Sequence, residues 1–142
     1  MKLAELIKGK PVEIIKIDAD STIVEAANLI TDNQVGALLV TSDGGEIAGI
    51  LSERDIVRGV SRHGADMHQV KVSELMTAKL IRCATTDSVN EAMAMMTDRH
   101  IRHLPVFDGD QLVGLISNRD LLKCRMMEIQ SEAEALRQYI LS

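Results

Sequence analysis

The stretch Gly49-Ile50-Leu51-Ser52-Glu53-Arg54-Asp55 returns as Gly114-Leu115-Ile116-Ser117-Asn118-Arg119-Asp120, at an offset of 65 residues. Upstream of it the offset is 66, because Glu25-Ala26 returns as Glu91-Ala92 and Leu38 returns as Leu104. The offset changes within residues 42–45 and 108–110, where a hairpin turn tolerates the loss of one residue. The chain therefore contains one internal repeat, and both copies should fold in the same way.

Each copy is predicted to be a β-α-β-β-α unit. The first strand is expected at 12–17 and 80–83, and the next two strands at 37–41 and 46–51, and at 103–107 and 111–117. The first helix begins after Thr22 or Ser88, because Thr-x-x-Glu and Ser-x-x-Glu fit the capping box and apolar residues follow at helical spacing. A second helix begins at Ser52 or Ser117. Residues 61–69 are predicted to form a polar loop, and residues 70–76 a short turn or helix capped by Ser73.

Composition sets the class of protein. The 142 residues are 46% apolar and 26% charged, with a net charge of −5, as in ordinary globular domains. No stretch is apolar for the ~20 residues that a membrane helix needs, and the first residues lack the basic start, apolar run and cleavage site of a secretory signal, so none is expected. Cys83 and Cys124 have no disulfide or metal-ligand spacing, which favours a reducing cytoplasm. The net negative charge is unfavourable for contact with phosphates, and Phe107 and Tyr139 are the only aromatic residues that could stack on bases. Both features argue against nucleic acid binding.

The last helix is predicted to be longer than its counterpart in the first copy. Its apolar residues follow each other at spacings of 4, 3, 4, 3 and 4, namely Leu122, Met126, Ile129, Ala133, Leu136 and Ile140. Such a 3.5-residue period is typical of helices that pair. Two interpretations stay open: a helix that lies on its own domain, and one that packs on a second subunit. The expected domains are 1–66 (first repeat with a lead-in), 67–125 (second repeat) and 126–142 (helix extension).

Two matched copies of Gly-h-h-Ser-x-x-Asp, where h is apolar, inside two β-α-β-β-α repeats resemble a tandem CBS-domain pair, or Bateman module. The run His100-Ile101-Arg102-His103-Leu104-Pro105-Val106 and the tail at 133–140 resemble small stand-alone bacterial members. The resemblance implies an α/β (α+β) fold with pseudo-twofold symmetry between the repeats. It also implies clefts that bind adenosyl ligands (AMP, ADP, ATP, NAD(H) or S-adenosylmethionine), a homodimer, and regulation of another protein.

The residues at the start of each second helix suit a nucleotide. The sets are Ser52, Arg54 and Asp55 in the first copy and Ser117, Arg119 and Asp120 in the second. An ionised carboxylate accepts hydrogen bonds from both ribose hydroxyls, and a helix N-terminus attracts phosphate. An Arg in the first turn opposes the helix dipole unless a bound anion compensates. The alternative is that Ser-x-x-Asp only caps the helix, and both interpretations can hold in the ligand-free protein.

The resemblance implies two unequal clefts. The cleft of the second motif is expected to contain Ser117, Arg119, Asp120, Arg102 and His103, with an adenine slot near Ile15 and Val35. The cleft of the first motif is expected to contain Ser52, Arg54, Asp55, Gly36 and Ala37, with a slot near Ile81 and Ile101. Residues 99–125 carry five Lys or Arg against three Asp, so the Asp120 cleft should hold the more phosphorylated or tighter ligand. Alternatively, Arg102 is a solvated charge at a strand end.

No enzyme is predicted. The sequence has no nucleophile with a plausible base, no Walker loop and no G-x-G-x-x-G motif, and no catalytic cofactor is expected. The four His residues lack metal-ligand spacing, so no metal site is expected, although a phosphate near His103 would raise the pKa of that imidazole. The leading hypothesis is a sensor of adenine nucleotides. The alternatives are an interaction protein that needs no ligand, and a binder of S-adenosylmethionine or nucleic acid.

Overall fold

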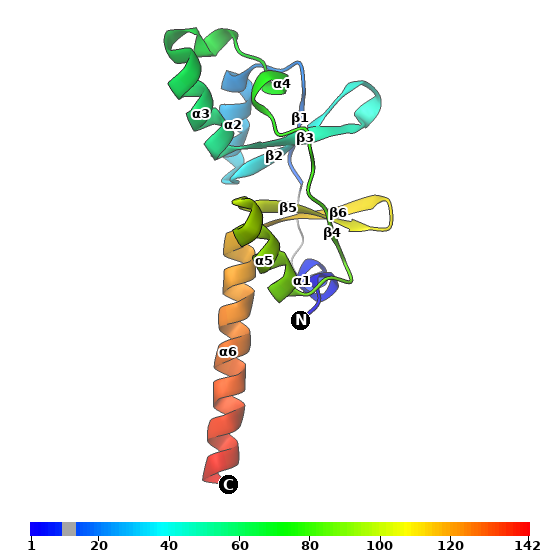
Figure 1. Cartoon of the computed structure of the whole chain (residues 1–142), viewed down its shortest axis with the longest axis vertical. Helices are drawn as coiled ribbons and strands as arrows, with labels where there is room; N and C mark the ends of the chain where they lie inside the picture. The colour runs from blue at the N-terminus through cyan, green and yellow to red at the C-terminus, as the bar shows by residue number, and fades with distance from the viewer. Residues whose placement is uncertain (10–13) are drawn as a thin grey trace. The chain divides into compact units, whose positions relative to one another are not determined.

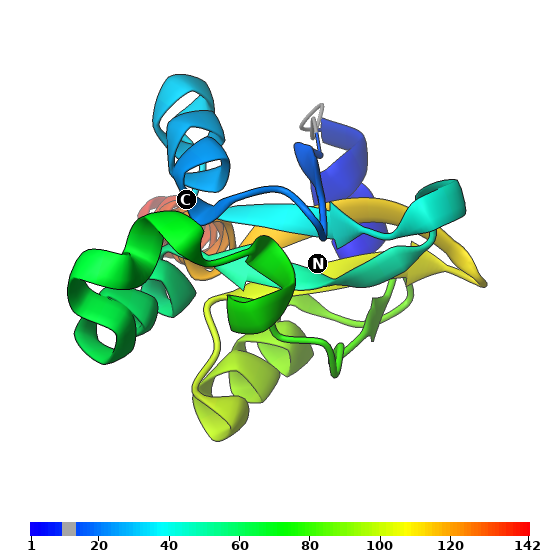
Figure 2. The same cartoon turned by 90° about the horizontal axis from the view of Figure 1, so that it is seen from above.

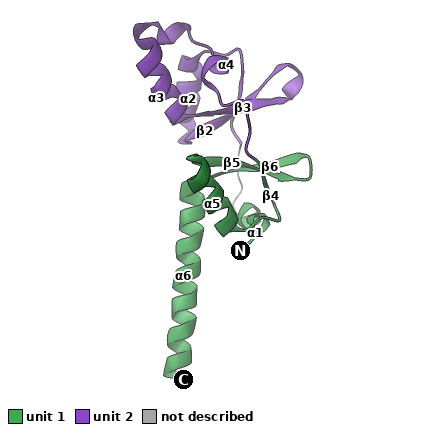
Figure 3. Cartoon of the chain, viewed as in Figure 1, with its two compact units in different colours: residues 1–12, 82–142 green, residues 13–81 purple. Residues whose placement is uncertain are grey.

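The computed structural model describes residues 1–9 and 14–142. The chain divides into two compact units, drawn in purple and green in Figure 3. Residues 13–81 form the first-repeat unit, and residues 1–12 with 82–142 form the second-repeat unit. Each unit contains one three-stranded sheet with helices packed around it. The predicted α/β class, the two β-α-β-β-α repeats and the long last helix are confirmed.

The first-repeat unit contains β1 (Lys16–Asp18), α2 (Ile23–Asn33), β2 (Ala37–Thr41), η1 (Asp43–Gly45), β3 (Ile47–Ser52), α3 (Glu53–His63), η2 (Gly64–Gln69) and α4 (Val72–Leu75). Its strand order is β1-β2-β3, with β1 parallel and β3 antiparallel to β2. Helices α2 and α3 lie at the opposite end of this sheet from the η1 turn (Figures 1 and 2). The core joins apolar residues of α2, all three strands and α4, including Ile23, Ala26, Leu38, Leu51 and Val72.

The second-repeat unit contains α1 (Leu3–Gly9), β4 (Cys83–Ala84), α5 (Val89–Arg99), β5 (His103–Asp108), β6 (Gln111–Ser117) and α6 (Asn118–Leu141). Its sheet repeats the first topology, in the order β4-β5-β6. The repeat extends to the helix ends: α2 and α5 both end in a left-handed residue, Gln34 at φ 53° and His100 at φ 55°. Each backbone N–H returns to the last turn of its helix, so both helices stop at equivalent positions.

The N-terminal segment packs with the second repeat. The N–H groups of Leu3 and Ala4 donate to the carbonyls of Asp87 (2.9 Å) and Thr85 (3.0 Å), and the side chain of Leu3 is fully buried. The sequence-based boundaries placed this segment with residues 14–66 as a lead-in. The structure differs because these backbone bonds extend the second-repeat unit, and no local pattern encodes such distant partners.

Residues 67–81 lie in the compact first-repeat unit of the structure, so the predicted boundary between residues 66 and 67 divides the sequence repeats rather than the compact units. The N–H of Val72 donates to the carbonyl of Ser21 (2.8 Å), and the N–H of Ser73 donates to that of Ala19 (3.0 Å). Thr77 and Ile50 exchange two backbone hydrogen bonds, at 2.9 and 3.0 Å. The segment after α3 therefore closes its own repeat before the chain passes to β4.

Several local predictions need correction. The predicted polar loop at 61–69 is instead the end of α3 and the 3₁₀ helix η2, because Met67 is partly buried against the first-repeat core. Helix α4 is capped at Lys71 rather than Ser73, since the carboxylate of Glu74 accepts from the N–H of Lys71 at 2.7 Å. The first strands are shorter and lie later than predicted, at 16–18 and 83–84. Residues 12 and 13 of the predicted first strand lie outside the described residues.

Candidate functional site

The first candidate site begins where β3 meets α3. Ser52 ends the strand and caps the helix, and its hydroxyl accepts from the N–H of Asp55 at 3.3 Å. One oxygen of the Asp55 carboxylate accepts from the N–H of Ser52 at 2.9 Å and from its hydroxyl at 3.1 Å. This reciprocal capping box fixes the direction of the carboxylate at the positive end of the helix dipole. Asp55 is only 8% exposed, so its capping bonds are largely shielded from water.

The second candidate site repeats this geometry where β6 meets α6. The Asp120 carboxylate accepts from the N–H of Ser117 at 3.0 Å, and the Ser117 hydroxyl accepts from the N–H of Asp120 at 3.1 Å. Arg54 and Arg119 occupy the same position in the first turns of their helices, and both are exposed. Ser-x-x-Asp therefore caps both helices, an outcome that both interpretations allow.

The start of the middle strand lies beside each cap. In the first-repeat unit the N–H of Glu53 donates to the carbonyl of Gly36 at 3.0 Å, and Ala37 faces Ser52 across the sheet. In the second-repeat unit the N–H of Asn118 donates to the carbonyl of Arg102 at 2.8 Å, and His103 faces Ser117. The structure thus brings Gly36, Ala37, Ser52 and Asp55 together in one unit. Equivalent contacts bring Arg102, His103, Ser117 and Asp120 together in the other.

The adenine-slot residues lie at equivalent places in their repeats. Ile15 precedes β1, and its carbonyl accepts from the N–H of Leu39 at 3.0 Å. Val35 follows α2 and Ile101 follows α5, and each N–H returns to the last turn of its helix, at 3.2 and 3.1 Å. Ile81 ends the first-repeat unit. All four side chains are half-buried.

A polar depression of about 230 Å³ lies beside Asp55 in the first-repeat unit. Its charged lining comes from α3 and α4, with Arg58, Arg62 and Glu74, and Thr77 supplies a further polar group. The Arg58 guanidinium nitrogen is 3.9 Å from the Asp55 carboxylate. Sequence analysis did not single out these arginines, although their spacing from Asp55 of three and seven residues places them on one helix face.

Neither a cluster of metal-ligating side chains nor a helix that could span a membrane is found in residues 1–9 and 14–142. No group of three or more His, Cys, Asp or Glu side chains there could hold a metal ion. None of the helices in this part of the chain has both the length and the apolar character to span a bilayer. Both cysteines are unpaired. Burial, with smaller effects from the carboxylates of Asp87 and Glu91, raises the pKa of the Cys83 thiol to about 11.

Comparison with known proteins agrees with this repeated architecture. Residues 10–62 and 72–126 match the family "CBS domain". The CBS domain-containing protein YhcV of Bacillus subtilis is 33% identical over 124 residues, which cover 87% of this chain and 86% of YhcV. The mitochondrial CBS domain-containing protein CBSX3 of Arabidopsis thaliana is 35% identical over 125 residues, which cover 85% of this chain. The chain spans between 38% and 65% of the length of CBSX3 and two other curated relatives.

A solved structure has the same fold. The crystal structure of the CBS-domain containing protein ATU1752 from Agrobacterium tumefaciens has a TM-score of 0.84 and 34% identity, and the match covers 87% of this chain and 92% of that chain. The chain therefore belongs to the CBS domain family and contains a tandem CBS domain pair, which is a regulatory module. The resemblance predicted from the two Gly-h-h-Ser-x-x-Asp motifs is confirmed.

Proposed function

We propose that this CBS pair senses adenine nucleotides: it binds AMP, ADP, ATP or NAD(H) at two sites and passes the occupancy to a regulated protein. The observation that carries the proposal is the repeated placement of Asp55 and Asp120 at the starts of α3 and α6. One carboxylate per repeat is a suitable anchor for the two hydroxyls of a ribose. The adjacent helix N-terminus and first-turn arginine suit the phosphate of the same ligand.

The capping boxes are compatible with this role. A carboxylate has roughly four lone-pair positions. In each box the Oδ2 atom of the aspartate accepts a capping bond from the backbone N–H of the serine. The cap holds the carboxylate in a fixed direction before a ligand binds. Such preorganisation lowers the entropy that is lost on binding.

A relative of the same fold supports the ligand class. The CBS domain pair of protein MJ0100 was solved in complex with 5′-methylthioadenosine and S-adenosyl-L-methionine, at 19% identity to this chain and a TM-score of 0.76. Both molecules contain an adenosyl group. A common adenosyl-binding mode would use the Asp of each repeat, with Ile15 and Val35 or Ile81 and Ile101 beside the base.

The two sites are proposed to differ in their preference for phosphate. Arg102 and His103 lie at the start of β5 beside Ser117, whereas the equivalent residues in the first repeat are Gly36 and Ala37. The Asp120 site would therefore hold the more phosphorylated or tighter ligand. The arginines of the depression beside Asp55 reduce this contrast, because Arg58 supplies a positive charge that the strand lacks.

The proposal extends to the assembly and its location. We expect a homodimer that acts without catalysis on a separate protein, in a reducing cytoplasm where Cys83 and Cys124 stay as thiols. One relative by fold, a CBS-CP12 protein of bloom-forming cyanobacteria, is described as hexameric. A ligand can shift the regulated state only by its difference in affinity for the two conformations.

Thermal unfolding with a panel of ligands tests the proposal. The panel holds AMP, ADP, ATP, NAD, NADH and S-adenosylmethionine, with GTP as the control. A ligand at a hundred times its dissociation constant stabilises the folded state by about 2.7 kcal/mol, a rise in Tm of roughly 5–15 °C for a chain of this size. Adenine compounds should raise the Tm and GTP should not. No shift with any of them at millimolar concentration would contradict the sensor and favour the interaction protein that needs no ligand.

A further inference from the structure

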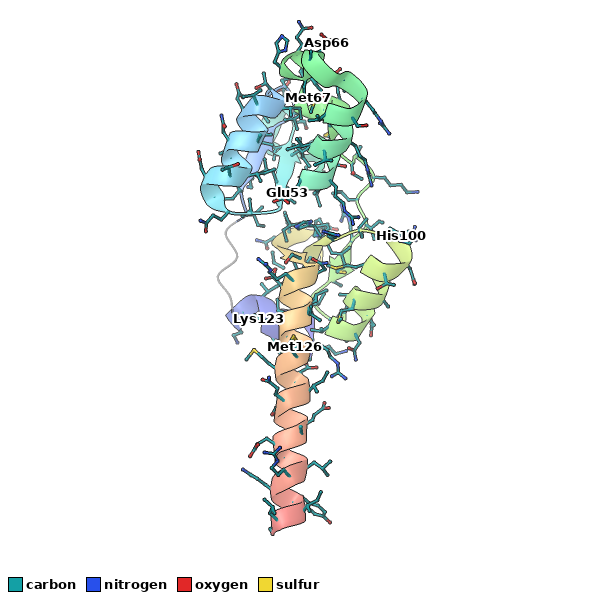
Figure 4. All side chains as sticks on the ribbon, turned by 90° about the vertical axis from the view of Figure 1, so that its left-hand side faces the viewer. Glu53, Asp66, Met67, His100, Lys123 and Met126 are labelled. Carbon is teal, nitrogen blue, oxygen red and sulfur yellow. The ribbon has the colours of Figure 1, made fainter. Side chains whose placement is uncertain are left out.

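Helix α6 extends well beyond the body of the second-repeat unit. In Figure 1 the later turns of α6, toward the red C-terminal end, have no other element beside them, and Figure 4 shows side chains on all sides of the helix beyond Met126. Most of the exposed large apolar side chains in residues 1–9 and 14–142 belong to this helix: Leu122, Met126, Met127, Ile129, Leu136, Tyr139, Ile140 and Leu141. Exposed apolar residues at this density mark an interaction surface.

Five of these residues form one stripe. Together with the exposed Ala133, the residues Leu122, Met126, Ile129, Leu136 and Ile140 recur at spacings of 4, 3, 4, 3 and 4. In heptad notation Met126, Ala133 and Ile140 take position a, and Leu122, Ile129 and Leu136 take position d. We call these six residues the α6 seam. Leu136 is 60% exposed and Ile140 is 72% exposed, so the seam is not buried against its own unit.

The charges beside the seam select one partner and one orientation. Lys123, Gln130 and Arg137 take position e, and Arg125, Glu132 and Tyr139 take position g. In a parallel pair of identical helices, position g of one chain faces position e of the next heptad in the other. Glu132 then faces Arg137 of the second copy, and two-fold symmetry gives this attractive pair twice. Arg125 faces the neutral Gln130, so no like charges meet.

An antiparallel pair that uses the whole seam is disfavoured by the same charges. In that arrangement Met126 faces Leu136 and Ile129 faces Ala133 across the interface. Position e then faces e, which brings Lys123 beside Arg137 twice, and position g faces g, which brings Glu132 beside Glu132. Like charges that face each other across a helix pair are repulsive and exclude the wrong partner. The charge pattern therefore matches a second copy of this chain in parallel.

We propose that the α6 seam pairs with the same seam of a second copy, in parallel and in register, as a short two-stranded coiled coil. The inference rests on the proposed homodimer and specifies which helix joins the two copies and in which direction. The seam covers residues 122–140, under three heptads, which is short for an isolated coiled coil. The pairing therefore adds to contacts elsewhere in the dimer. The seam contains none of the proposed ligand-binding residues, so dimerisation through it does not require nucleotide.

Cysteine cross-linking of the full chain tests the direction. In a parallel, in-register pair the two copies of Leu136 face each other, within the roughly 4–7 Å between Cα atoms that a disulfide spans. Leu136→Cys should therefore form a disulfide-linked dimer under mild oxidation. Gln138→Cys, on the opposite face of α6, is the matched control and should not. Wild type sets the baseline for Cys83 and Cys124. Cross-linking of a Met126→Cys/Leu136→Cys double variant without cross-linking of Leu136→Cys would overturn the parallel arrangement.

A charge exchange tests the pairing by analytical ultracentrifugation. Glu132→Arg alone and Arg137→Glu alone each place like charges together twice, and each should raise the dimer dissociation constant by about tenfold. The double variant Glu132→Arg/Arg137→Glu should return to near the wild-type value. Glu132→Arg also removes a 3.9 Å contact with Arg125 of the same helix. The double variant does not restore that contact, so recovery in it would come from the pairing between copies.

The outcomes separate this inference from the proposed function. Leu136→Asp should raise the dissociation constant by on the order of a hundredfold, while the Tm shift produced by AMP stays as in wild type. A wild-type dimer whose dissociation constant is unchanged in Leu136→Asp would overturn the α6 pairing and leave the homodimer intact. A wild-type chain that is monomeric at tens of micromolar would overturn both. Loss of the AMP shift in wild type would overturn the sensor and leave the pairing untouched.

Discussion

Ser117 and Asp120 each cap the backbone of the other: the Asp120 carboxylate accepts from the Ser117 N–H at 3.0 Å, and the Ser117 hydroxyl accepts from the Asp120 N–H at 3.1 Å. Ser52 and Asp55 hold the same relationship in the first repeat, at 2.9 and 3.3 Å. Each aspartate therefore has two roles, one in the stability of its helix and one, as we propose, in binding. A useful variant must separate the two.

The first prediction separates binding from capping at Asp120. Asp120→Ala should lower the free energy of unfolding by about 1 kcal/mol through loss of the cap. It should also lower nucleotide affinity by on the order of 1.5–3 kcal/mol, because hydrogen bonds to a charged group are lost. Isothermal titration with the ligand found in the thermal panel measures the second effect. Asp55→Ala should act in the same way on the other site.

The control for this experiment is Ser88→Ala. Ser88 caps α5 in the same unit, and its hydroxyl accepts from the N–H of Glu91 at 3.0 Å, but it is not among the proposed ligand residues. The variant should lose about 1 kcal/mol of stability and keep full affinity. If Asp120→Ala and Asp55→Ala both bind as wild type does, the assignment of these carboxylates to ribose is wrong.

A second prediction compares equivalent glycines of the two repeats. A Cβ atom added at Gly49 would lie 2.5 Å from the carbonyl oxygen of Thr77, a backbone atom that is itself held by Ile50. A Cβ atom added at Gly114 would meet only the flexible end of the Ile7 side chain, at 3.3 Å. Gly49→Ala should therefore cost about 1–3 kcal/mol of stability, and Gly114→Ala less. Denaturant unfolding measures both, and equal losses would contradict the close approach of residues 76–77 to β3.

Much of the fold could be predicted from the repeat. Because Leu38 returns as Leu104 at a fixed offset, each strand and helix of the β-α-β-β-α unit is predicted twice, and β2 and β6 are predicted at their observed bounds. The predictions failed where tertiary contacts override local pattern. Residues 61–69 look polar, yet Met67 packs beside Gly59, whose added Cβ would lie 2.7 Å from the Met67 methyl. The N-terminal segment carries no local sign that it binds β4 and α5.

The candidate site also contains some residues that local sequence spacing predicts and others that depend on tertiary contacts. The Ser and Asp of each motif could be predicted, because the spacing of three residues brings them together at any helix start. The carbonyls of Gly36 and Arg102, which accept from the first N–H of α3 and α6, could not, because these bonds depend on strand register. The arginines beside Asp55 were missed because residues 58 and 62 lie outside the motif.

A third prediction concerns the Cys83 thiol, which is 2% exposed and has a pKa raised to about 11, chiefly by burial. In the unfolded chain the thiol loses its proton at a lower pH, so the unfolded state binds fewer protons as the pH rises. The free energy of unfolding should therefore fall between about pH 9 and about pH 11, by up to about 2–3 kcal/mol.

Cys83→Ala isolates this effect. Between about pH 9 and about pH 11 the free energy of unfolding of Cys83→Ala should fall less than that of wild type. The matched control Cys124→Ala should keep the contribution of Cys83 to this fall. Urea unfolding at intervals between pH 8 and about pH 11 would measure the difference. Identical pH profiles for wild type and Cys83→Ala would show that the thiol is not shielded. Alkylation at pH 8 gives an independent reading, because a buried, protonated thiol should react only after unfolding.

The last prediction concerns the N-terminal segment. Leu3 is fully buried, and its N–H donates to the carbonyl of Asp87, while the carbonyl of Met1 accepts from the N–H of Val89 at 2.9 Å. Leu3→Ala should cost about 2–5 kcal/mol, and the loss should fall on the second-repeat unit. Hydrogen exchange resolved by mass spectrometry should show faster exchange in 83–117 and little change in 16–63. The exposed neighbour Ala4→Ser is the control and should leave both regions protected. Faster exchange confined to the first repeat in Leu3→Ala would instead support the sequence-based boundary, in which this segment leads into residues 14–66.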